Sequence, residues 1–99
     1  MTIKRIEGSF NPISKRGPMF HCEVRLNTAP PASWAAWFDE HLALEPRGPT
    51  YQIALRGAVV SFYAQRKDVE EAIRRIDRAA GHANREAARH DVDARPAGA

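Results

Sequence analysis

Apolar and polar residues alternate along several segments of the chain, and this alternation predicts β-strands. In the clearest segment, Phe20–Asn27, every second residue from the first is apolar and the residues between them are polar. A polar side indicates an antiparallel sheet with one solvent-facing surface, rather than a parallel sheet buried on both faces. The same alternation recurs in Thr50–Arg56, which predicts a second strand.

A third strand is predicted at Ala58–Ala64, directly after a turn glycine. Val60 and Phe62 are expected to face the core of the protein. The opposite orientation stays open from the sequence alone, because Val59 and Tyr63 are also apolar.

Two further segments carry apolar residues at the spacing of an α-helix. The first follows Thr28–Pro31, whose prolines are tolerated in a first helical turn. Its apolar face has the spacing i, i+3, i+4, i+7, i+8 and consists of Trp34, Trp37, Phe38, His41 and Leu42. The second helix is predicted at Asp68–Arg89, with Asp68 as its N-cap. Its apolar stripe alternates steps of four and three residues and consists of Val69, Ile73, Ile76, Ala80, Ala83 and Ala87.

The order strand, helix, strand, strand, helix predicts an α+β fold. We expect an antiparallel three- or four-stranded sheet with two helices on one face, (β)βαββα, a variant of the ferredoxin-like plait. Residues 1–10 are a candidate for the fourth strand, at the sheet edge beside Phe20–Asn27, although Gly8 disfavours it. Residues 11–18 contain Asn-Pro and Gly-Pro pairs and are predicted to form a loop.

The length of 99 residues fits one domain with a single core. We assign this domain to residues 1–90. Residues 91–99 are expected to form a disordered C-terminal tail, because they lack periodicity and contain only one sizeable apolar residue, Val92. No apolar run reaches the roughly 18 residues of a membrane span, and no apolar segment follows the basic residues near Met1. The chain is therefore expected to be cytoplasmic, with no membrane partner.

The sequence contains none of the compact motifs that identify an enzyme or a cofactor site. Nucleophile elbows, P-loops, dinucleotide-binding glycine patterns, paired-histidine zinc helices and CxxC pairs are absent. The four histidines are scattered, so no metal site is predicted. The single cysteine, Cys22, lies on the apolar side of its strand and is expected to be buried and unreactive. No catalytic residue and no cofactor are assigned, and a non-enzymatic protein is expected.

The aromatic helix carries one candidate partner surface. Aromatic residues at helical spacing are usually core residues, but two tryptophans in one turn are more than such a helix commonly buries completely. We therefore assign Trp34 and Trp37 to a candidate partner surface. Because aromatic residues are enriched at interfaces, a homodimer is an alternative to a separate partner.

Basic residues outnumber acidic residues by 15 to 12, and the formal net charge is +3. The tripeptide Arg-Gly-Pro occurs at residues 16–18 and 47–49, directly before two predicted strands that a plait makes parallel. Both turns would then lie at the end of the sheet where the second helix begins. The topology therefore predicts a cluster that binds an anion or nucleic acid, composed of Lys15, Arg16, Arg47, Arg66 and Lys67. The alternatives are a compositional bias toward arginine and a helix end already occupied by Asp68.

The solvent-facing side of the predicted sheet is a second candidate for nucleic-acid binding. A plait with aromatic and arginine side chains on its open face can bind single-stranded RNA by stacking. The side chains expected on this face are His21, Arg25, Gln52, Arg56 and Tyr63. Glu23 on the same face opposes this interpretation, and the interleaved aromatic signature is missing. The sequence therefore favours an ordinary solvated face.

These observations favour a small, non-enzymatic protein-interaction module, which could bind a separate partner or form a homodimer. The alternative is a nucleic-acid- or phosphate-binding protein that uses the basic cluster. A small enzyme with an arginine and a polar side chain on the sheet is a third class, which no motif supports. No motif names the partner.

Overall fold

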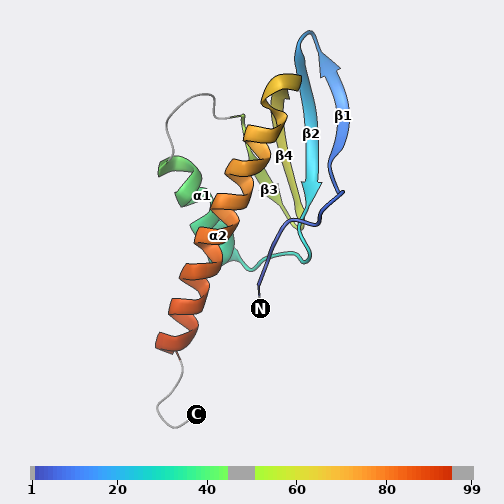
Figure 1. Ribbon diagram of the computed structural model, residues 1–99. Coiled ribbons are helices and arrows are strands. Elements are labelled where there is room, and N and C mark those ends of the chain that lie inside the picture. Colours follow the sequence, from blue (N-terminus) through green and yellow to red (C-terminus); the bar gives the residue numbers. More distant parts are fainter. Residues whose placement is uncertain (1, 45–50, 95–99) are drawn as a thin grey trace.

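The computed structural model describes residues 2–44 and 51–94 of the chain. Within these residues, a sheet lies on one side of the molecule and two helices lie on the other (Figure 1). A short 3₁₀-helix, η1, leads into the second α-helix. In chain order the elements are β1 (Asn11–Arg16), β2 (Met19–Arg25), α1 (Ala32–Leu44), β3 (Ala54–Arg56), β4 (Val59–Gln65), η1 (Arg66–Asp68) and α2 (Val69–Ala94).

The sheet has the strand order β1-β2-β4-β3, and every neighbouring pair is antiparallel. β4 therefore lies between β2 and β3, which run parallel to each other. α2 packs against β4, and α1 packs along α2 on the same side of the sheet (Figure 1). This arrangement confirms the predicted α+β class, with an antiparallel four-stranded sheet and two helices.

The register between β2 and β4 decides which side chains face the core. Cys22 pairs with Phe62 and Val24 pairs with Val60, and all four side chains are fully buried. Directly opposed residues of an antiparallel pair share one face, so the residues between them lie on the outer, solvent-facing side. The predicted orientation of both strands is confirmed, with Val60 and Phe62 directed inward.

The edge position beside β2 is taken by β1, and the predicted loop at residues 11–18 is therefore wrong. Pro12 is compatible with an edge strand, because one side of such a strand makes no ladder hydrogen bonds. The pairing of β1 with β2 shifts register between Pro12 and Ser14, as at a β-bulge. Gly17, with a φ of 56°, turns the chain into β2. The candidate strand at residues 1–10 adds only one isolated bridge to the sheet.

β3 is shorter than the predicted strand Thr50–Arg56, of which residue 50 lies outside the described residues. Tyr51 and Gln52 adopt left-handed backbone conformations, with φ values of 56° and 48°, which are unusual for residues other than glycine. The Tyr63 N–H still donates a hydrogen bond to the Tyr51 carbonyl at 2.7 Å. The Tyr51 side chain is buried, with 7% exposed. Tyr51 is therefore apolar because it is buried in a turn, and not because it belongs to a strand.

Both helices bury the apolar faces that their sequences predict. On α1, Trp34 and Phe38 are buried, and their rings stack with 5.4 Å between centroids. On α2, Ile76, Ala80 and Ala83 of the predicted stripe are buried. The remaining stripe residues pack against the core and are half-buried: Val69, Ile73 and Ala87.

The ends of α2 differ from the prediction. Helical backbone begins at Arg66 in η1, so Asp68 lies within a helical turn and is not the N-cap. α2 continues to Ala94, so its last four residues fall within the tail that the sequence predicts at residues 91–99. Residues 95–99 lie outside the described residues.

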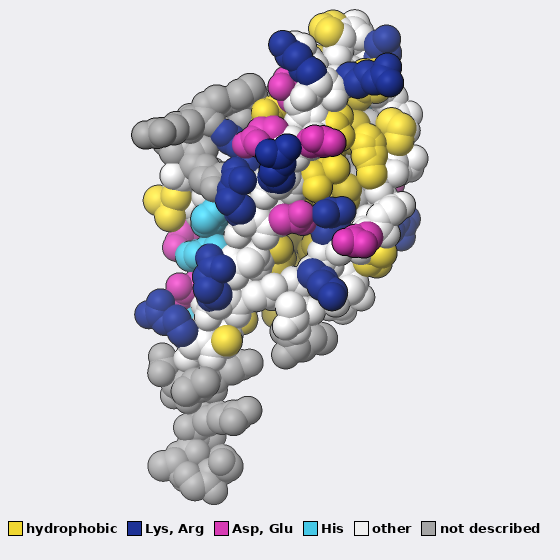
Figure 2. Space-filling model, viewed as in Figure 1, with side chains coloured by type: hydrophobic (Ala, Val, Ile, Leu, Met, Phe, Trp, Pro, Cys, Tyr) yellow, Lys and Arg dark blue, Asp and Glu magenta, His cyan; other side chains and the backbone are white. Residues whose placement is uncertain are grey.

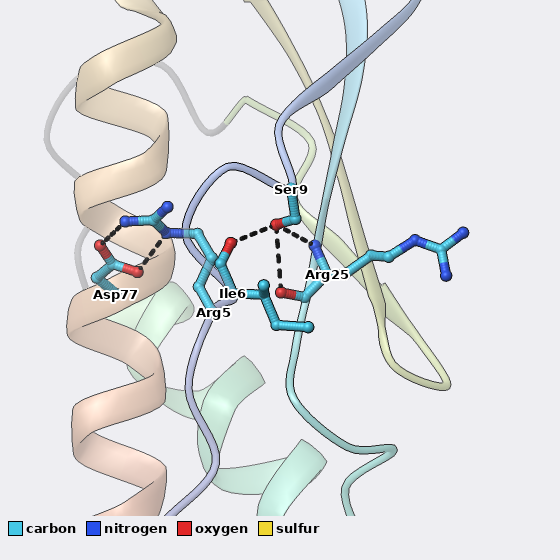
Figure 3. A network of polar contacts seen from close by, with 5 residues as sticks. All are labelled: Arg5, Ile6, Ser9, Arg25 and Asp77. Atoms are coloured by element: carbon cyan, nitrogen blue, oxygen red, sulfur yellow. Dashed lines mark hydrogen bonds and ion pairs between the residues drawn. The ribbon is translucent and has the colours of Figure 1, made fainter.

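Residues 2–9, which include a turn at residues 7 and 8, lie between the sheet and α2, and we call them the N-terminal strap (Figure 3). The Arg5 guanidinium donates hydrogen bonds of 2.9 and 3.0 Å to the Asp77 carboxylate of α2. The Ser9 hydroxyl donates to the Ile6 carbonyl at 2.6 Å and accepts from the Arg25 N–H at 3.0 Å. The strap is therefore bonded to the helix on one side and to β2 on the other.

Two asparagines hold the beginning of the strap. Asn84 of α2 accepts hydrogen bonds from the Ile3 N–H at 3.0 Å and from the Trp34 Nε1–H at 2.9 Å. Its amide also donates to the Ile3 carbonyl at 2.7 Å. Asn27, at the surface, makes two hydrogen bonds of 3.1 Å with the backbone of the residues on either side of Ile3. Because Ile3 is only 3% exposed, the strap closes one end of the core.

Cys22 is expected to react with a thiol reagent only when the protein opens. The side chain is fully buried, and burial raises the pKa of the thiol above its ordinary value. The thiolate is the reactive form, so it is both scarce and inaccessible. We expect slow labelling of the native protein by a chromogenic disulfide reagent and fast labelling after unfolding in guanidinium. Fast, complete labelling without denaturant would contradict the assignment of Cys22 to the core face of β2.

Candidate functional site

An apolar groove opens on the inner face of the sheet, between β1, β2 and the beginning of α2. It is a hollow of about 300 Å³. We call it the apolar groove, and it is lined by Phe10, Pro12, Phe20, Cys22, Arg66 and Val69. Figure 2 shows hydrophobic side chains (yellow) exposed to the right of α2, in this part of the molecule.

The groove exists because the helices and the strap cover only part of the inner face. α2 packs over β4, so the inner sides of β1 and β2 extend beyond it (Figure 1). The strap fills the part of this space near Ile3. At the other end, Phe10 packs edge-to-face on Phe62 with 6.4 Å between ring centroids. Phe10, Phe20 and Val69 nevertheless keep part of their surfaces exposed to solvent.

Four of the five residues predicted to form the basic cluster lie at one end of the sheet. The β1–β2 turn places Lys15 and Arg16 there, and the end of β4 places Arg66 and Lys67 there. All four side chains are exposed. Figure 2 shows Lys and Arg side chains (dark blue) at this end of the molecule. Arg47 lies outside the described residues.

These cations divide between the two faces of the sheet. Lys15 pairs with Phe20 in the β1–β2 register, and its ammonium group lies 5.3 Å from the centre of the Phe20 ring, a cation–π distance. Arg66 lines the apolar groove on the same side. Arg16 pairs with Met19 on the outer face instead. Lys15 and Arg66 therefore form a basic rim on the apolar groove.

The two tryptophans assigned to a partner surface have different positions. Trp34 is 1% exposed, and its indole N–H is bonded to Asn84, so it is a core residue and not a surface residue. Trp37 is half-buried and stacks on His90 of α2, with 4.9 Å between ring centroids. Neither tryptophan lines the apolar groove.

The contact between α1 and α2 also brings imidazole groups together. The His41 and His82 rings lie 5.1 Å apart, and a Glu40 carboxylate oxygen lies 3.7 Å from His82 Nε2. Among the side chains that the structure describes, in residues 2–44 and 51–90, no group of three or more His, Cys, Asp or Glu is arranged to hold a metal ion. We therefore place no metal on this helix contact.

The outer face of the sheet has a second hollow, of about 590 Å³. His21 of β2 and Tyr63 of β4 stand side by side in it, with 4.5 Å between ring centroids and 9° between ring planes. The outward orientation of these two residues agrees with the alternation in the sequence.

Of the residues that line the apolar groove, only Arg66 belongs to a site predicted from the sequence, and Phe20 and Cys22 are predicted only as the apolar side of a strand. The other three are Phe10, Pro12 and Val69. Phe10 and Pro12 stand in segments without a clear strand pattern, and Val69 is one member of a helical stripe. Their contribution arises from tertiary packing, so no local signal marks them as a site.

Comparison with protein-family models, with curated proteins and with solved structures finds no match to this chain. In the part of the chain that the structure describes, no helix is long and apolar enough to cross a membrane. Function is therefore inferred from the residues and their geometry.

Proposed function

We propose that the protein is a small, non-enzymatic, cytoplasmic interaction module whose apolar groove binds a short segment of a partner protein. The observation that supports this proposal is the open apolar groove with its basic rim, on the face of the sheet that otherwise forms the core. The expected segment presents one bulky apolar side chain to the groove. Acidic residues beside that side chain would pair with Lys15 and Arg66.

The expected affinity follows from the size and charge of the groove. A volume of about 300 Å³ is at the small end of the range for binding pockets. Burying one Leu or Phe side chain contributes about 1.5–3 kcal/mol, and an exposed ion pair contributes up to about 1 kcal/mol. These magnitudes support weak, reversible binding of the kind found in transient complexes.

A separate partner is favoured over a homodimer. β1 is the long open edge of the sheet, but Pro12, the adjacent register shift and the cations Lys15 and Arg16 are features that discourage edge-to-edge pairing. Sedimentation velocity over increasing protein concentration separates the two forms. A stable dimer that Val69→Glu abolishes would identify a second copy as the occupant of the groove.

Binding of nucleic acid or a phosphate ligand at the basic end is the second candidate function. It rests on the convergence of Lys15, Arg66 and Lys67 at one end of the sheet. Phosphate contacts make affinity fall steeply with salt concentration, whereas burial of an apolar side chain in the groove does not. A salt titration of the bound complex therefore separates the two functions.

The groove is tested with a random peptide library displayed on phage and selected against the wild-type protein. Selected peptides are expected to share a Trp, Phe or Leu next to Asp or Glu. For the best synthetic peptide, Val69→Glu is expected to weaken binding at least about tenfold, equivalent to about 1.4 kcal/mol. The substitution places a charge in the apolar groove, while an acidic residue in the first turn of a helix is otherwise well tolerated.

Val59→Glu is the matched control for this substitution. Val59 is also a half-buried valine, but it lies on the outer face of the sheet, so its variant is expected to bind the peptide like the wild type. Equal losses in the two variants, or a library selection without a shared apolar and acidic pattern, would overturn the proposal.

A further inference from the structure

The outer face of the sheet carries a stacked pair of rings that the apolar groove does not use. His21 and Tyr63 are directly opposed on β2 and β4, and their rings are parallel within 9° at 4.5 Å. Tyr63 is 37% exposed. The hollow beside the two rings is lined by Ser14, Arg16, Met19, His21, Gln52 and Tyr63. A flat aromatic ring placed in this hollow would extend the existing stack.

Cations lie on both sides of this stack, along the direction of the strands. Arg25 and Arg56 both pair with Val59, so they form one row on the outer face, on the side of the β3–β4 turn. Arg16 pairs with Met19 in a row at the opposite end. Arg25 lies six positions after Met19 along β2, which corresponds to about 20 Å.

The charge of the outer face is positive along this length. Among the described residues of the strands, three exposed arginines, one each from β1, β2 and β3, share the face with one half-buried acid, Glu23. An anionic chain that runs along the strands would meet Arg16 before the stack, then Glu23, and then Arg25 and Arg56. A single phosphate group cannot contact both rows at once, because about 20 Å of strand separates them.

We propose that the outer face of the sheet binds a segment of single-stranded nucleic acid. One unpaired base stacks on the His21–Tyr63 pair, and phosphates of the nucleotides that precede and follow it contact Arg16 at one end and Arg25 with Arg56 at the other. A base inside a duplex is already stacked and paired, so it has no free face for Tyr63. The ligand is therefore single-stranded, and the mode of recognition is stacking with backbone neutralisation.

The test uses a fluorescently labelled single-stranded oligouridine, titrated with the full chain and followed by fluorescence anisotropy. Tyr63→Ala is expected to weaken binding about 10- to 100-fold, the usual effect of removing one stacking ring. Tyr63→Phe keeps the ring and is expected to bind like the wild type. Substituting Arg25 and Arg56 by Gln is expected to reduce the slope of log affinity against log salt by about 0.7 for each phosphate that is no longer neutralised.

Val69→Glu is the control on the opposite face and is expected to leave oligouridine binding unchanged. The proposed nucleic-acid site and the proposed peptide-binding groove can therefore each fail while the other stands. Circular dichroism of each variant confirms that it is folded. Equal affinity for a duplex of the same length, full competition by uridine monophosphate, or equal losses in Tyr63→Phe and Tyr63→Ala would overturn the proposal. So would binding that depends on Lys15 and Arg66 but not on Arg25 and Arg56.

Discussion

Replacing Asn84 by alanine is expected to lower the free energy of unfolding by about 2–4 kcal/mol. The substitution removes three hydrogen bonds and leaves the Trp34 Nε1–H and the Ile3 backbone without these partners. Trp34 and Ile3 are 1% and 3% exposed, so water does not readily replace the missing amide. A buried polar group that loses its partner costs about 1–3 kcal/mol. Urea denaturation followed by tryptophan fluorescence measures the change.

Asn27→Ala is the matched control for Asn84→Ala. Asn27 also bonds to the strap backbone through both ends of its amide, but these bonds are exposed to solvent. Water can take the place of the amide there, so the expected loss is below about 1 kcal/mol. Equal destabilisation of the two variants would show that burial is not the reason why the hydrogen bonds of Asn84 stabilise the protein.

Ile76→Ala is expected to destabilise the protein by about 2–4 kcal/mol, which is a large share of the stability of a small domain. Ile76 is fully buried in the middle of α2. Truncation of its side chain removes buried apolar surface and leaves a cavity that its neighbours fill only in part. Chemical denaturation at equilibrium gives the difference in the free energy of unfolding.

Ile73→Ala serves as the control, because it makes the same substitution on the same helix about one turn earlier. Ile73 is only half-buried, so its truncation is expected to cost clearly less than that of Ile76. The sequence pattern alone gives both residues the same weight, since both lie in one apolar stripe. Equal costs would show that the exposed side of Ile73 is covered in solution.

The elements with one buried side could be predicted from the sequence. β2, β4 and both helices place apolar residues on one side and polar residues on the other, so the periodicity of each segment reports its structure directly. The order of these elements then restricts the topology, because short connections favour antiparallel neighbours.

The edge of the sheet could not be predicted in the same way. All six residues of β1 are exposed, so no alternation marks the strand, and Pro12 suggests a loop. β1 is a strand because β2 provides hydrogen-bond partners, which is a tertiary effect. Tyr51 is the opposite case. It belongs to an alternating pattern that predicts a strand, but its buried side chain lies in a left-handed turn before β3.

The candidate site is predictable only where it depends on topology. Arg66 and Lys15 can be placed at one end of the sheet because β4 returns to the β1–β2 turn. The apolar groove cannot be predicted, since it arises where α2 and the strap leave β1 and the Phe20 end of β2 only partly covered. The helical spacing places Trp34 on the buried side of α1, but it does not show that the indole N–H is satisfied there, because its partner, Asn84, is 50 positions away.

The N-terminal strap also imposes an order on the assembly of the chain. Its hydrogen-bond partners on α2 follow it by 72 residues for Arg5 with Asp77 and by 81 residues for Ile3 with Asn84. Contacts between such distant residues close large loops and form slowly. During synthesis on the ribosome, the strap emerges long before α2, so it can bond to β2 first and to Asp77 and Asn84 only after α2 has been made. The indole N–H of Trp34 also depends on Asn84, so α2 completes both contacts in one late step.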